Sequence, residues 1–337
     1  MATIRAVAPG RVNLIGGHVD FHEGPVVSMA IDRSVRVEAV ATDDGRVTVR
    51  SAAFAGVVDV AADGSTAPPT IVPAWGRLVG GVVAELAAGG RSPVGIDAVV
   101  TSDLGRGGGL SSSAAFEVAL ALVLAAAAGF AVTGRELAAA ARAAEHAATG
   151  VPCGIQDQLT SVVGGVVLID CRTLDVSPMT LPDRTAVVVV DSGVARTLEA
   201  SPWAARREES FADAAALGLR VLRDATPDVV RGRPRAEHVV GEIDRVRRFV
   251  DALAAGDAID AGRLMTESHR SSRDLWKSSL PELDAVVERL LDAGAHGARL
   301  TGGGFGGYVV GLVPEAAVDR IGRECVVRPA GPAKVES

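Results

Sequence analysis

Residues 104–122 read Leu-Gly-Arg-Gly-Gly-Gly-Leu-Ser-Ser-Ser-Ala-Ala-Phe-Glu-Val-Ala-Leu-Ala-Leu, and this stretch decides the fold. Its three consecutive glycines let the backbone turn tightly and approach a ligand without Cβ clashes. The serines that follow are expected to cap an Ala/Leu-rich helix. A glycine loop that ends at a helix N-terminus gathers unpaired backbone N–H groups and the positive end of the helix dipole, which is typical of a phosphate site. A flexible turn before a buried helix is the alternative that this stretch alone leaves open.

Length and composition limit the class of protein. A chain of 337 residues exceeds the usual size of a single core, so two domains are expected. The hydrophobic fraction of 48% and the charged fraction of 22% are those of a globular protein. The net charge of −7, without any basic run, disfavours a partner made of nucleic acid.

Cysteine usage and hydropathy indicate a cytoplasmic protein. Cys153, Cys171 and Cys325 lack metal-like or disulfide-like spacing, which suits a reducing compartment. The first ten residues lack the apolar run of a signal peptide, and the most apolar stretch, 118–132, is short for a membrane span. We therefore expect no membrane partner, and the sequence leaves a monomer or a homodimer open.

The order of expected elements predicts an α+β fold. A β-rich part is followed by a helical part and a βαβ-like close, which indicates two domains, 1–180 and 181–337, with a loose tail after about residue 328. A loop is expected at 10–21, and Asp43-Asp44-Gly45 is expected to be a hairpin turn between two strands. The other expected strands lie at 4–8, 25–30, 35–42, 47–51, 94–101, 165–170, 186–191, 297–301 and 308–313, and the helices at 75–88, 135–148, 203–217, 236–255, 257–267 and 281–293.

Two nucleotide-binding motifs are missing from the sequence. It contains no Gly-x-x-x-x-Gly-Lys-[Ser/Thr], and no Gly-x-Gly-x-x-Gly that lies between a strand and a helix with an acid about 20 residues further on. The first absence excludes a P-loop protein, and the second disfavours a dinucleotide fold. A loop at 107–113 would instead hold a triphosphate through backbone N–H groups. Ser113 and Glu145 supply the oxygen ligands that Mg²⁺ prefers. Glu145 as a solvent-facing helix charge remains the alternative.

Several polar residues are candidates for catalysis and substrate binding. Asp157 is a candidate base or electrostatic partner for a hydroxyl nucleophile, with Arg11 balancing charge at the transferred phosphoryl group. A turn-forming Asp157 is the alternative. His18 and Asp20 are candidates for hydrogen bonds to a polyol, against a loop whose polar groups satisfy one another.

Together these stretches resemble the galactokinase branch of the GHMP small-molecule kinases over nearly the whole chain. Residues 10–21 are similar to the galactokinase signature Gly-Arg-x-Asn-Leu-Ile-Gly-Glu-His-x-Asp-Tyr, and residues 107–115 to the ATP loop Gly-Gly-Gly-Leu-Ser-Ser-Ser-Ala. The remaining matches are Ala-Glu-His…Gly-x-Pro-Cys-Gly-Ile-x-Asp-Gln at 144–158, Glu-Ser-His…Arg-Asp with Pro-Glu-Leu-Asp at 267–284, and Gly-Ala-Arg-x-Thr-Gly-Gly-Gly-Phe-Gly-Gly at 297–307.

The resemblance implies a GHMP kinase fold, with an N-terminal α/β domain, a ferredoxin-like C-terminal domain and the site in the cleft between them. It implies ATP and Mg²⁺ as cofactors and a small-molecule sugar or cyclitol as substrate. It makes Asp157 the catalytic carboxylate beside Arg11, and places Ser113 and Glu145 at Mg²⁺. The phosphates would be surrounded by Gly107, Gly108, Gly109, Leu110, Ser111 and Ser112, the adenine would lie beside Trp75, and His18, Asp20 and the backbone at Gly154 would contact the sugar.

The departures from the family pattern concentrate at the sugar. Gly17 stands where galactokinases have a Glu that contacts the hydroxymethyl end of galactose, Trp203 stands for a sugar-contacting Tyr, and Phe21 replaces another Tyr. A lost hydrogen bond to a substrate hydroxyl costs about 1–3 kcal/mol. We therefore predict a sugar-1-kinase whose substrate is altered or anionic at C6: a uronate, a 6- or 7-phosphate of a sugar or cyclitol, or a pentose. An ordinary galactokinase is the alternative. A non-catalytic sugar sensor is disfavoured because the catalytic residues are present.

Overall fold

The computed structural model describes residues 2–105, 109–195 and 202–336. In chain order its helices and strands are β1 (Thr3–Ile15), β2 (Pro25–Thr42), β3 (Arg46–Ser51), β4 (Val57–Ala61), α1 (Gly76–Ala88), β5 (Gly95–Ser102), α2 (Ser112–Ala127), α3 (Gly134–Thr149), α4 (Gln156–Val163), β6 (Val166–Asp170), β7 (Asp175–Met179), β8 (Thr185–Asp191), α5 (Trp203–Ala216), α6 (Pro234–Ala254), α7 (Ala258–Ser271), α8 (Pro281–Asp292), β9 (Gly297–Leu300), β10 (Tyr308–Pro314), α9 (Val318–Ile321), β11 (Val326–Val327) and β12 (Lys334–Glu336). This mixture confirms the α+β prediction, and the predicted helices are present with ends that differ by a few residues. In the described part of the chain, no helix has the length and apolar character needed to cross a membrane.

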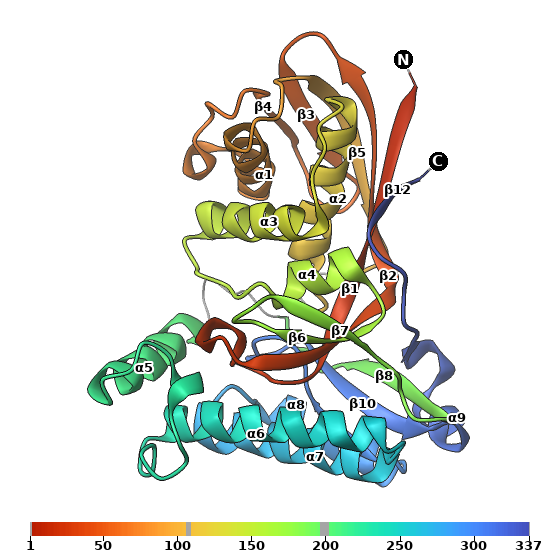
Figure 1. Ribbon diagram of the computed structural model, residues 1–337. Helices are drawn as coiled ribbons and strands as arrows, with labels where there is room; N and C mark the ends of the chain where they lie inside the picture. Colours follow the sequence, from red (N-terminus) through yellow and green to blue (C-terminus); the bar gives the residue numbers. More distant parts are fainter. Residues whose placement is uncertain (1, 106–108, 196–201, 337) are drawn as a thin grey trace.

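The strands form two sheets that meet at the middle of the molecule (Figure 1). In the described residues the larger sheet has the order β12-β1-β2-β5-β3-β4, with β6 beside β2 and β7 beside β6. Helices α1 to α4 gather beside it, and α2 is buried on nearly every face, as its Ala/Leu content predicts. The smaller sheet has the order β11-β8-β10-β9, with α6, α7 and α8 below it in the view. The predicted boundary at 180 falls between β7 and β8, and the division itself stays a prediction.

The hairpin predicted at Asp43-Asp44-Gly45 was wrong. That turn connects β2 to β3, but β5 lies between the two strands, antiparallel to β2 and parallel to β3. Gly95 begins β5 in this gap, where an added Cβ would lie 2.6 Å from the carbonyl oxygen of Arg46. A turn sequence specifies only a local reversal of the chain, whereas strand order depends on which distant strand pairs with it.

Further segments differ from the predictions: α4, β4 and β7 were not predicted, and β2 is one strand where two were expected. Residues 11–15 belong to β1, so the catalytic candidate Arg11 lies on a strand and not in a loop. The segment after residue 328 is not loose, because β12 pairs antiparallel with β1, with Arg5 opposite Glu336. The backbone N–H of Ala330 also donates to the carbonyl of Ala30 at 2.9 Å. Both ends of the chain therefore lie at the same edge of the larger sheet (Figure 1).

Candidate active site

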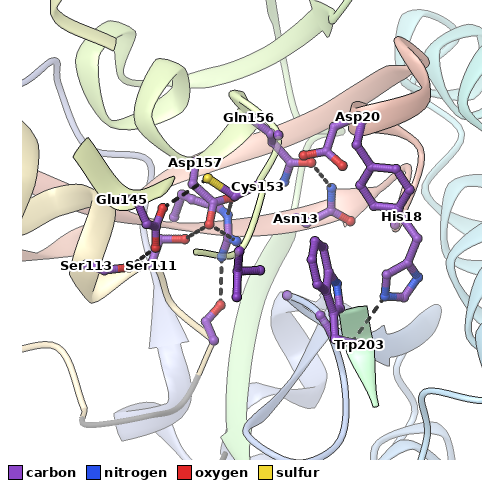
Figure 2. A pocket seen from close by; sticks show the side chains of 18 of the residues that line it. Asn13, His18, Asp20, Ser111, Ser113, Glu145, Cys153, Gln156, Asp157 and Trp203 are labelled. Carbon is purple, nitrogen blue, oxygen red and sulfur yellow. Dashed lines mark hydrogen bonds and ion pairs between the residues drawn. The ribbon is translucent and has the colours of Figure 1, made fainter. Parts of the chain in front are cut away.

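A cavity of about 200 Å³ lies where the two sheets meet, and most of the predicted site residues line it (Figure 2). Strand β1 and the loop after it contribute one wall, and the N-terminal turns of α2 and α4 contribute another. The loop after β9 closes the cavity through Gly302 and Gly303. The predicted residues that it brings together are Arg11, Gly17, His18, Asp20, Gly109, Ser111, Ser112, Ser113, Glu145, Gly154, Asp157 and Trp203. Leu110 is buried beneath them, and Gly107 and Gly108 lie outside the described residues.

Arg11 and Asp157 form a two-pronged ion pair at the centre of the cavity. The Arg11 Nε donates to Oδ1 of Asp157 at 2.7 Å, and Nη2 donates to Oδ2 at 2.5 Å. The remaining Nη1 donates to the carbonyl of Gly109 at 2.7 Å. A bidentate pair of this kind fixes the plane of the carboxylate as well as its position. Since Arg11 is buried on β1 and Asp157 begins α4, the pair also ties the strand to the helix.

Ser111 supplies a third hydrogen bond to this carboxylate. It occupies the N-cap position of α2 with a left-handed φ of 60°, and its side chain does not cap the helix. The hydroxyl instead donates to Oδ2 of Asp157 at 2.5 Å. The prediction that Ser111 is a capping side chain was therefore wrong. A left-handed conformation is costly for a residue with a Cβ, and here it turns the hydroxyl toward the cavity.

Glu145 lies beside this pair and is not a solvent-facing helix charge. Ser113 donates to its Oε1 at 2.8 Å, while Oε2 accepts from the amide of Gln158 at 2.7 Å and faces the thiol of Cys153 at 3.4 Å. Burial, together with the nearby Asp157, raises the pKa of Glu145. Removal of this carboxylate from water is offset when a cation binds it.

The residues at this point fit Mg²⁺. Ser113 and Glu145 offer hard oxygen ligands, and both line the cavity. Within the described ranges, no three His, Cys, Asp or Glu side chains converge on a metal position. Mg²⁺ commonly takes one or two protein oxygens and completes its shell with phosphate oxygens and water. Such a site requires a nucleotide to be complete.

Trp75 lies in a neighbouring apolar cavity of about 160 Å³. Its ring stacks against Phe54 with centroids 6.2 Å apart, and its Nε1 donates to the carbonyl of Ala55 at 3.1 Å. Ser112 and Ser113 line both cavities and so connect them. A flat apolar slot beside a helix N-terminus suits a nucleobase whose phosphates reach that N-terminus.

His18 presents a defined hydrogen-bond acceptor to the first cavity. Its Nε2 lies 3.2 Å from the carbonyl oxygen of Gly303. A carbonyl only accepts, so Nε2 carries the proton and Nδ1 is the acceptor. Burial, with His238 nearby, lowers the pKa of His18 well below its usual range, so the ring is neutral. Within the described residues the buried Nδ1 has no hydrogen-bond partner, so this acceptor is unpaired.

Asp20 and Gly154 fit each other closely. An added Cβ on Gly154 would overlap the carboxylate of Asp20, so only glycine allows this approach. Burial and the charge of Asp157 raise the pKa of Asp20 from 3.8 to about 6. Trp203 is buried and meets the ring of Phe21 edge to face, with centroids 5.7 Å apart. These side chains give the cavity one polar wall and one aromatic wall.

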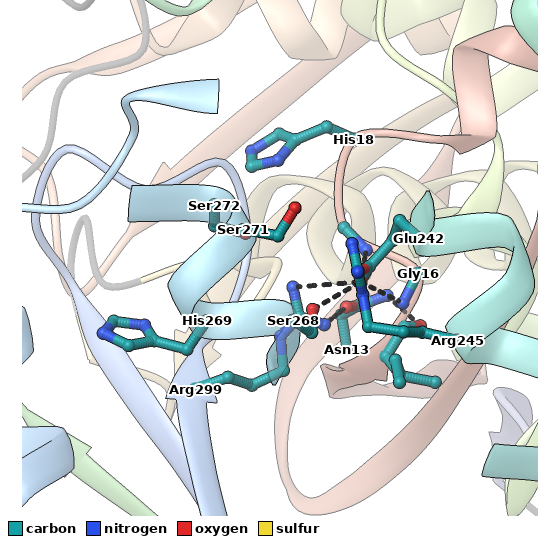
Figure 3. A network of polar contacts seen from close by, with 12 residues as sticks. Asn13, Gly16, His18, Glu242, Arg245, Ser268, His269, Ser271, Ser272 and Arg299 are labelled. Atoms are coloured by element: carbon teal, nitrogen blue, oxygen red, sulfur yellow. Dashed lines mark hydrogen bonds and ion pairs between the residues drawn. The ribbon is translucent and has the colours of Figure 1, made fainter. Parts of the chain in front are cut away.

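A buried ionic cluster of Glu242, Arg245 and Arg299 lies beside Gly16 (Figure 3), behind the loop that carries Gly17. The backbone N–H of Gly17 donates to Glu242 Oε1 at 3.1 Å, and the same carboxylate pairs with Arg245 at 2.7 Å and lies 4.0 Å from Nη2 of Arg299. Arg299 has no exposed surface, and its Nη1 donates to Asn13. An added Cβ on Gly17 would overlap Arg299 Nη2, which has no hydrogen-bond partner in the part of the chain that the structure describes. Two guanidinium groups therefore share one carboxylate.

Sequence reasoning missed several polar residues in and behind the cavity. Asn13 links β1 to α4 through a hydrogen bond from its Nδ2 to Gln156 Oε1 at 3.0 Å, and Thr301 bonds the backbone of Asn13. Glu117 is the one charged residue in α2. A single acid in an otherwise apolar helix could have marked it as a candidate buried residue. Gln158 and Arg299 stand in the family motifs at 144–158 and 297–307, but only the packing shows which buried groups they meet.

The chain matches three family descriptions. Residues 77–165 match the GHMP kinases N terminal domain, residues 249–326 match the GHMP kinases C terminal domain, and residues 2–40 match the galactokinase galactose-binding signature.

Curated relatives cover nearly the whole chain. A galactokinase of Roseiflexus sp. (strain RS-1) is 42% identical over 330 residues, which are 93% of this chain and 84% of the relative. A galactokinase of Chloroflexus aggregans is 41% identical over 335 residues, 93% of this chain and 85% of the relative.

Solved structures agree in fold. The Lactococcus lactis galactokinase complexed with galactose superposes with a TM-score of 0.90 at 26% identity, covering 98% of this chain and 95% of that one. The Methanococcus jannaschii mevalonate kinase has a TM-score of 0.72 at 18% identity, covering 100% and 99%, which is a likeness of fold alone.

Proposed function

Because this chain belongs to the galactokinase branch of the GHMP kinases, and is thereby an ATP-dependent sugar kinase, we propose that it phosphorylates the anomeric hydroxyl of galactose. The names of its relatives, and the galactose in the Lactococcus lactis complex, support this substrate better than the C6-altered sugar predicted from the sequence. An ordinary galactokinase, which was the alternative prediction from the sequence, therefore becomes the main proposal.

One observation carries the catalytic part of this proposal: the bidentate Arg11–Asp157 pair lies in the sugar cavity, beside the start of α2. Asp157 orients the anomeric hydroxyl, whose oxygen attacks the γ-phosphorus of ATP in line while the bond from that phosphorus to the β,γ-bridging oxygen breaks and ADP leaves. The proton of the hydroxyl passes to the Asp157 carboxylate. Arg11 keeps its guanidinium between that carboxylate and the carbonyl of Gly109, where negative charge of the phosphates is neutralised.

The remaining residues bind and orient the two substrates. Mg²⁺, when bound at Ser113 and Glu145, supplies positive charge to the phosphate oxygens. The backbone N–H groups at the start of α2 face the same phosphates, and Trp75 lies beside the base. His18 Nδ1 and Asp20 accept hydrogen bonds from sugar hydroxyls. Phosphoryl transfer depends chiefly on such positioning and charge neutralisation.

A second candidate substrate is favoured by the cluster behind Gly17. Arg299 and Arg245 share the single carboxylate of Glu242, and His18 and His238 are neutral because burial lowers the pKa of both, that of His238 to about 4. The cluster is therefore cationic next to the position where galactokinases carry a Glu. A sugar with an anionic C6 substituent would be attracted there, because charges interact strongly in a buried setting.

The test is an ADP-release assay with MgATP and a panel of galactose, galacturonate, arabinose, galactosamine, sugar 6-phosphates and a C7 cyclitol phosphate. Galactose with the highest kcat/KM supports the main proposal. If an anionic sugar has the highest kcat/KM, the second candidate substrate is supported and the galactose proposal is contradicted. Turnover of ATP with none of the panel, or without any need for a sugar, contradicts both.

A further inference from the structure

Glu117 is a buried acid that the proposed reaction does not use. It lies on α2 with no exposed surface, in a helix whose other residues are Ala, Leu, Val, Ser and Phe. The nearest polar side chain is that of Gln158, which belongs to α4 and is equally buried. Burying a carboxyl group and an amide costs free energy that an apolar pair of the same size would not. Two buried polar groups at this position therefore call for a role.

Gln158 connects Glu117 to Glu145. Its Nε2 donates to Oε2 of Glu145 at 2.7 Å and lies 3.3 Å from Oε2 of Glu117. Glu145 thus has one oxygen occupied by the amide, while Oε1 faces Ser113 at 2.8 Å. The three groups come from three helices, α2, α3 and α4, whose packing fixes their separation.

Few hydrogen-bond donors reach the carboxyl oxygens of Glu117 and Glu145. The Gln158 amide is the only described donor to either Oε2 apart from the Cys153 thiol, which reaches only Glu145. Oε1 of Glu117 and Oε1 of Gln158 are both buried without a hydrogen-bond partner among the described residues. Burial, with Glu145 nearby, raises the pKa of Glu117 well above its usual range, which favours the neutral form of this group.

We propose that Gln158 and Glu117 are positioning residues for the metal: they hold Oε2 of Glu145 so that its Oε1 stays turned, with the Ser113 hydroxyl, toward Mg²⁺. This inference rests on the proposed function, in which Glu145 is the metal carboxylate. Groups that orient a metal ligand commonly affect affinity by roughly 10–100-fold when removed. Such residues act through Glu145 and contact neither sugar nor nucleotide.

The experiment measures Mn²⁺ binding to the enzyme with a non-hydrolysable ATP analogue, by electron paramagnetic resonance, together with kinetics. Gln158→Leu is expected to weaken Mn²⁺ binding roughly tenfold and to raise the Mg²⁺ concentration for half-maximal rate, with KM for the sugar unchanged. Glu117→Leu weakens binding less, because Gln158 still reaches Glu145. Glu117→Gln, which keeps a neutral group of the same shape, restores the affinity lost in Glu117→Leu.

A matched variant separates positioning from loss of stability. Glu136 completes the capping box with Thr133 at the opposite end of α3 from Glu145. Glu136→Ala is expected to lower the thermal midpoint and leave Mn²⁺ affinity unchanged. If Gln158→Leu does not fold, Glu117→Leu and Glu117→Gln carry the comparison.

The outcomes distinguish this inference from the proposed function. Folded Gln158→Leu and Glu117→Leu enzymes that bind Mn²⁺ as the wild type does overturn the positioning role, provided that Glu145→Gln binds it weakly. Unchanged Mn²⁺ binding in Glu145→Gln itself overturns the metal site on which the inference rests. Parallel loss of Mn²⁺ affinity in Glu136→Ala also overturns it, because destabilisation alone would then explain the effect.

Discussion

The two ends of the sugar cavity differ in how completely their polar groups are paired. At the phosphoryl-transfer end, Arg11 uses three of its donors, and both oxygens of Asp157 accept hydrogen bonds. At the opposite end His18 Nδ1 has no hydrogen-bond partner in the described parts of the chain, and behind that end neither have Nη2 and Nε of the fully buried Arg299. The first end is preorganised without ligand, whereas unpaired polar atoms lie at the second end and in the buried cluster behind it.

We infer from this difference that the first end performs phosphoryl transfer and the second end selects the sugar. Transfer of a phosphoryl group requires fixed charges that do not reorganise during the reaction. Selection of a sugar instead uses groups that become paired only when the correct ligand arrives, since an unpaired buried group penalises the wrong one. Gly17 lies at the second end, where the sequence also departs most from the galactokinase pattern. Substitutions at the two ends should therefore have different signatures.

The largest effect is expected at the paired end. Asp157→Asn keeps the shape of the side chain but removes the charge that orients the hydroxyl and balances Arg11. We expect kcat to fall about a thousandfold, measured by ADP release. The thermal midpoint should also fall, because the buried Arg11 guanidinium loses its counter-charge, so the rate is measured at a temperature where the variant is folded. Asp59→Asn, which removes an exposed partner of Arg46, is the control and should leave kcat unchanged. A fall of less than tenfold would contradict an essential role for Asp157.

Gly17→Glu tests the unpaired end. The added Cβ would overlap Nη2 of Arg299, so the guanidinium must shift. We expect the new carboxylate to pair with it, because opposite charges attract strongly in a buried setting. We expect the ratio of kcat/KM for galactose to that for anionic sugars to rise roughly 10–100-fold. Gly17→Gln is the matched control because it has the same size without the charge. Equal changes of the ratio in both variants would show that space, and not charge, governs selection.

Trp75→Ala tests whether the neighbouring apolar cavity binds the nucleotide and has no part in binding the sugar. Loss of the stacking surface should raise KM for ATP about tenfold and leave KM for the sugar unchanged. The measurement is initial rate against each substrate in turn. Val72→Ala, at an 84% exposed position near Trp75 in sequence, should change neither constant. A rise in the sugar KM alone would place the nucleobase elsewhere.

The smallest effect concerns Asp20 and depends on pH. Its pKa is about 6 in the folded protein against an ordinary 3.8, so the folded state binds this proton more tightly and ionisation of Asp20 lowers stability as pH rises between those values. At a pH above about 6, Asp20→Asn is therefore expected to raise the thermal midpoint by a few degrees. At a pH below 3.8 this gain should vanish. Sugar binding should weaken. A gain that is the same at both pH values would contradict the raised pKa.

The sequence alone indicated much of the paired end. The glycine-serine stretch before an apolar helix, the Arg in residues 10–21 and the Asp after Gly-Ile-Gln each carry local patterns that a phosphate site and a catalytic carboxylate require. The cavity unites these residues. The contacts of these side chains were less predictable. Ser111 is a residue type that commonly caps helices, but its hydroxyl donates to Asp157.

The amino-acid sequence alone established local features: the α+β order of elements, the spans of the helices other than α4, the glycine loops and the residue types that suit a kinase. These follow from short-range periodicity and backbone preference. Only the tertiary structure decided that β5 separates β2 from β3, that β12 returns to β1, and that Glu117 and Arg299 are buried beside particular partners. Strand order and the pairing of buried charges depend on contacts between residues far apart in the chain, and no local pattern encodes them.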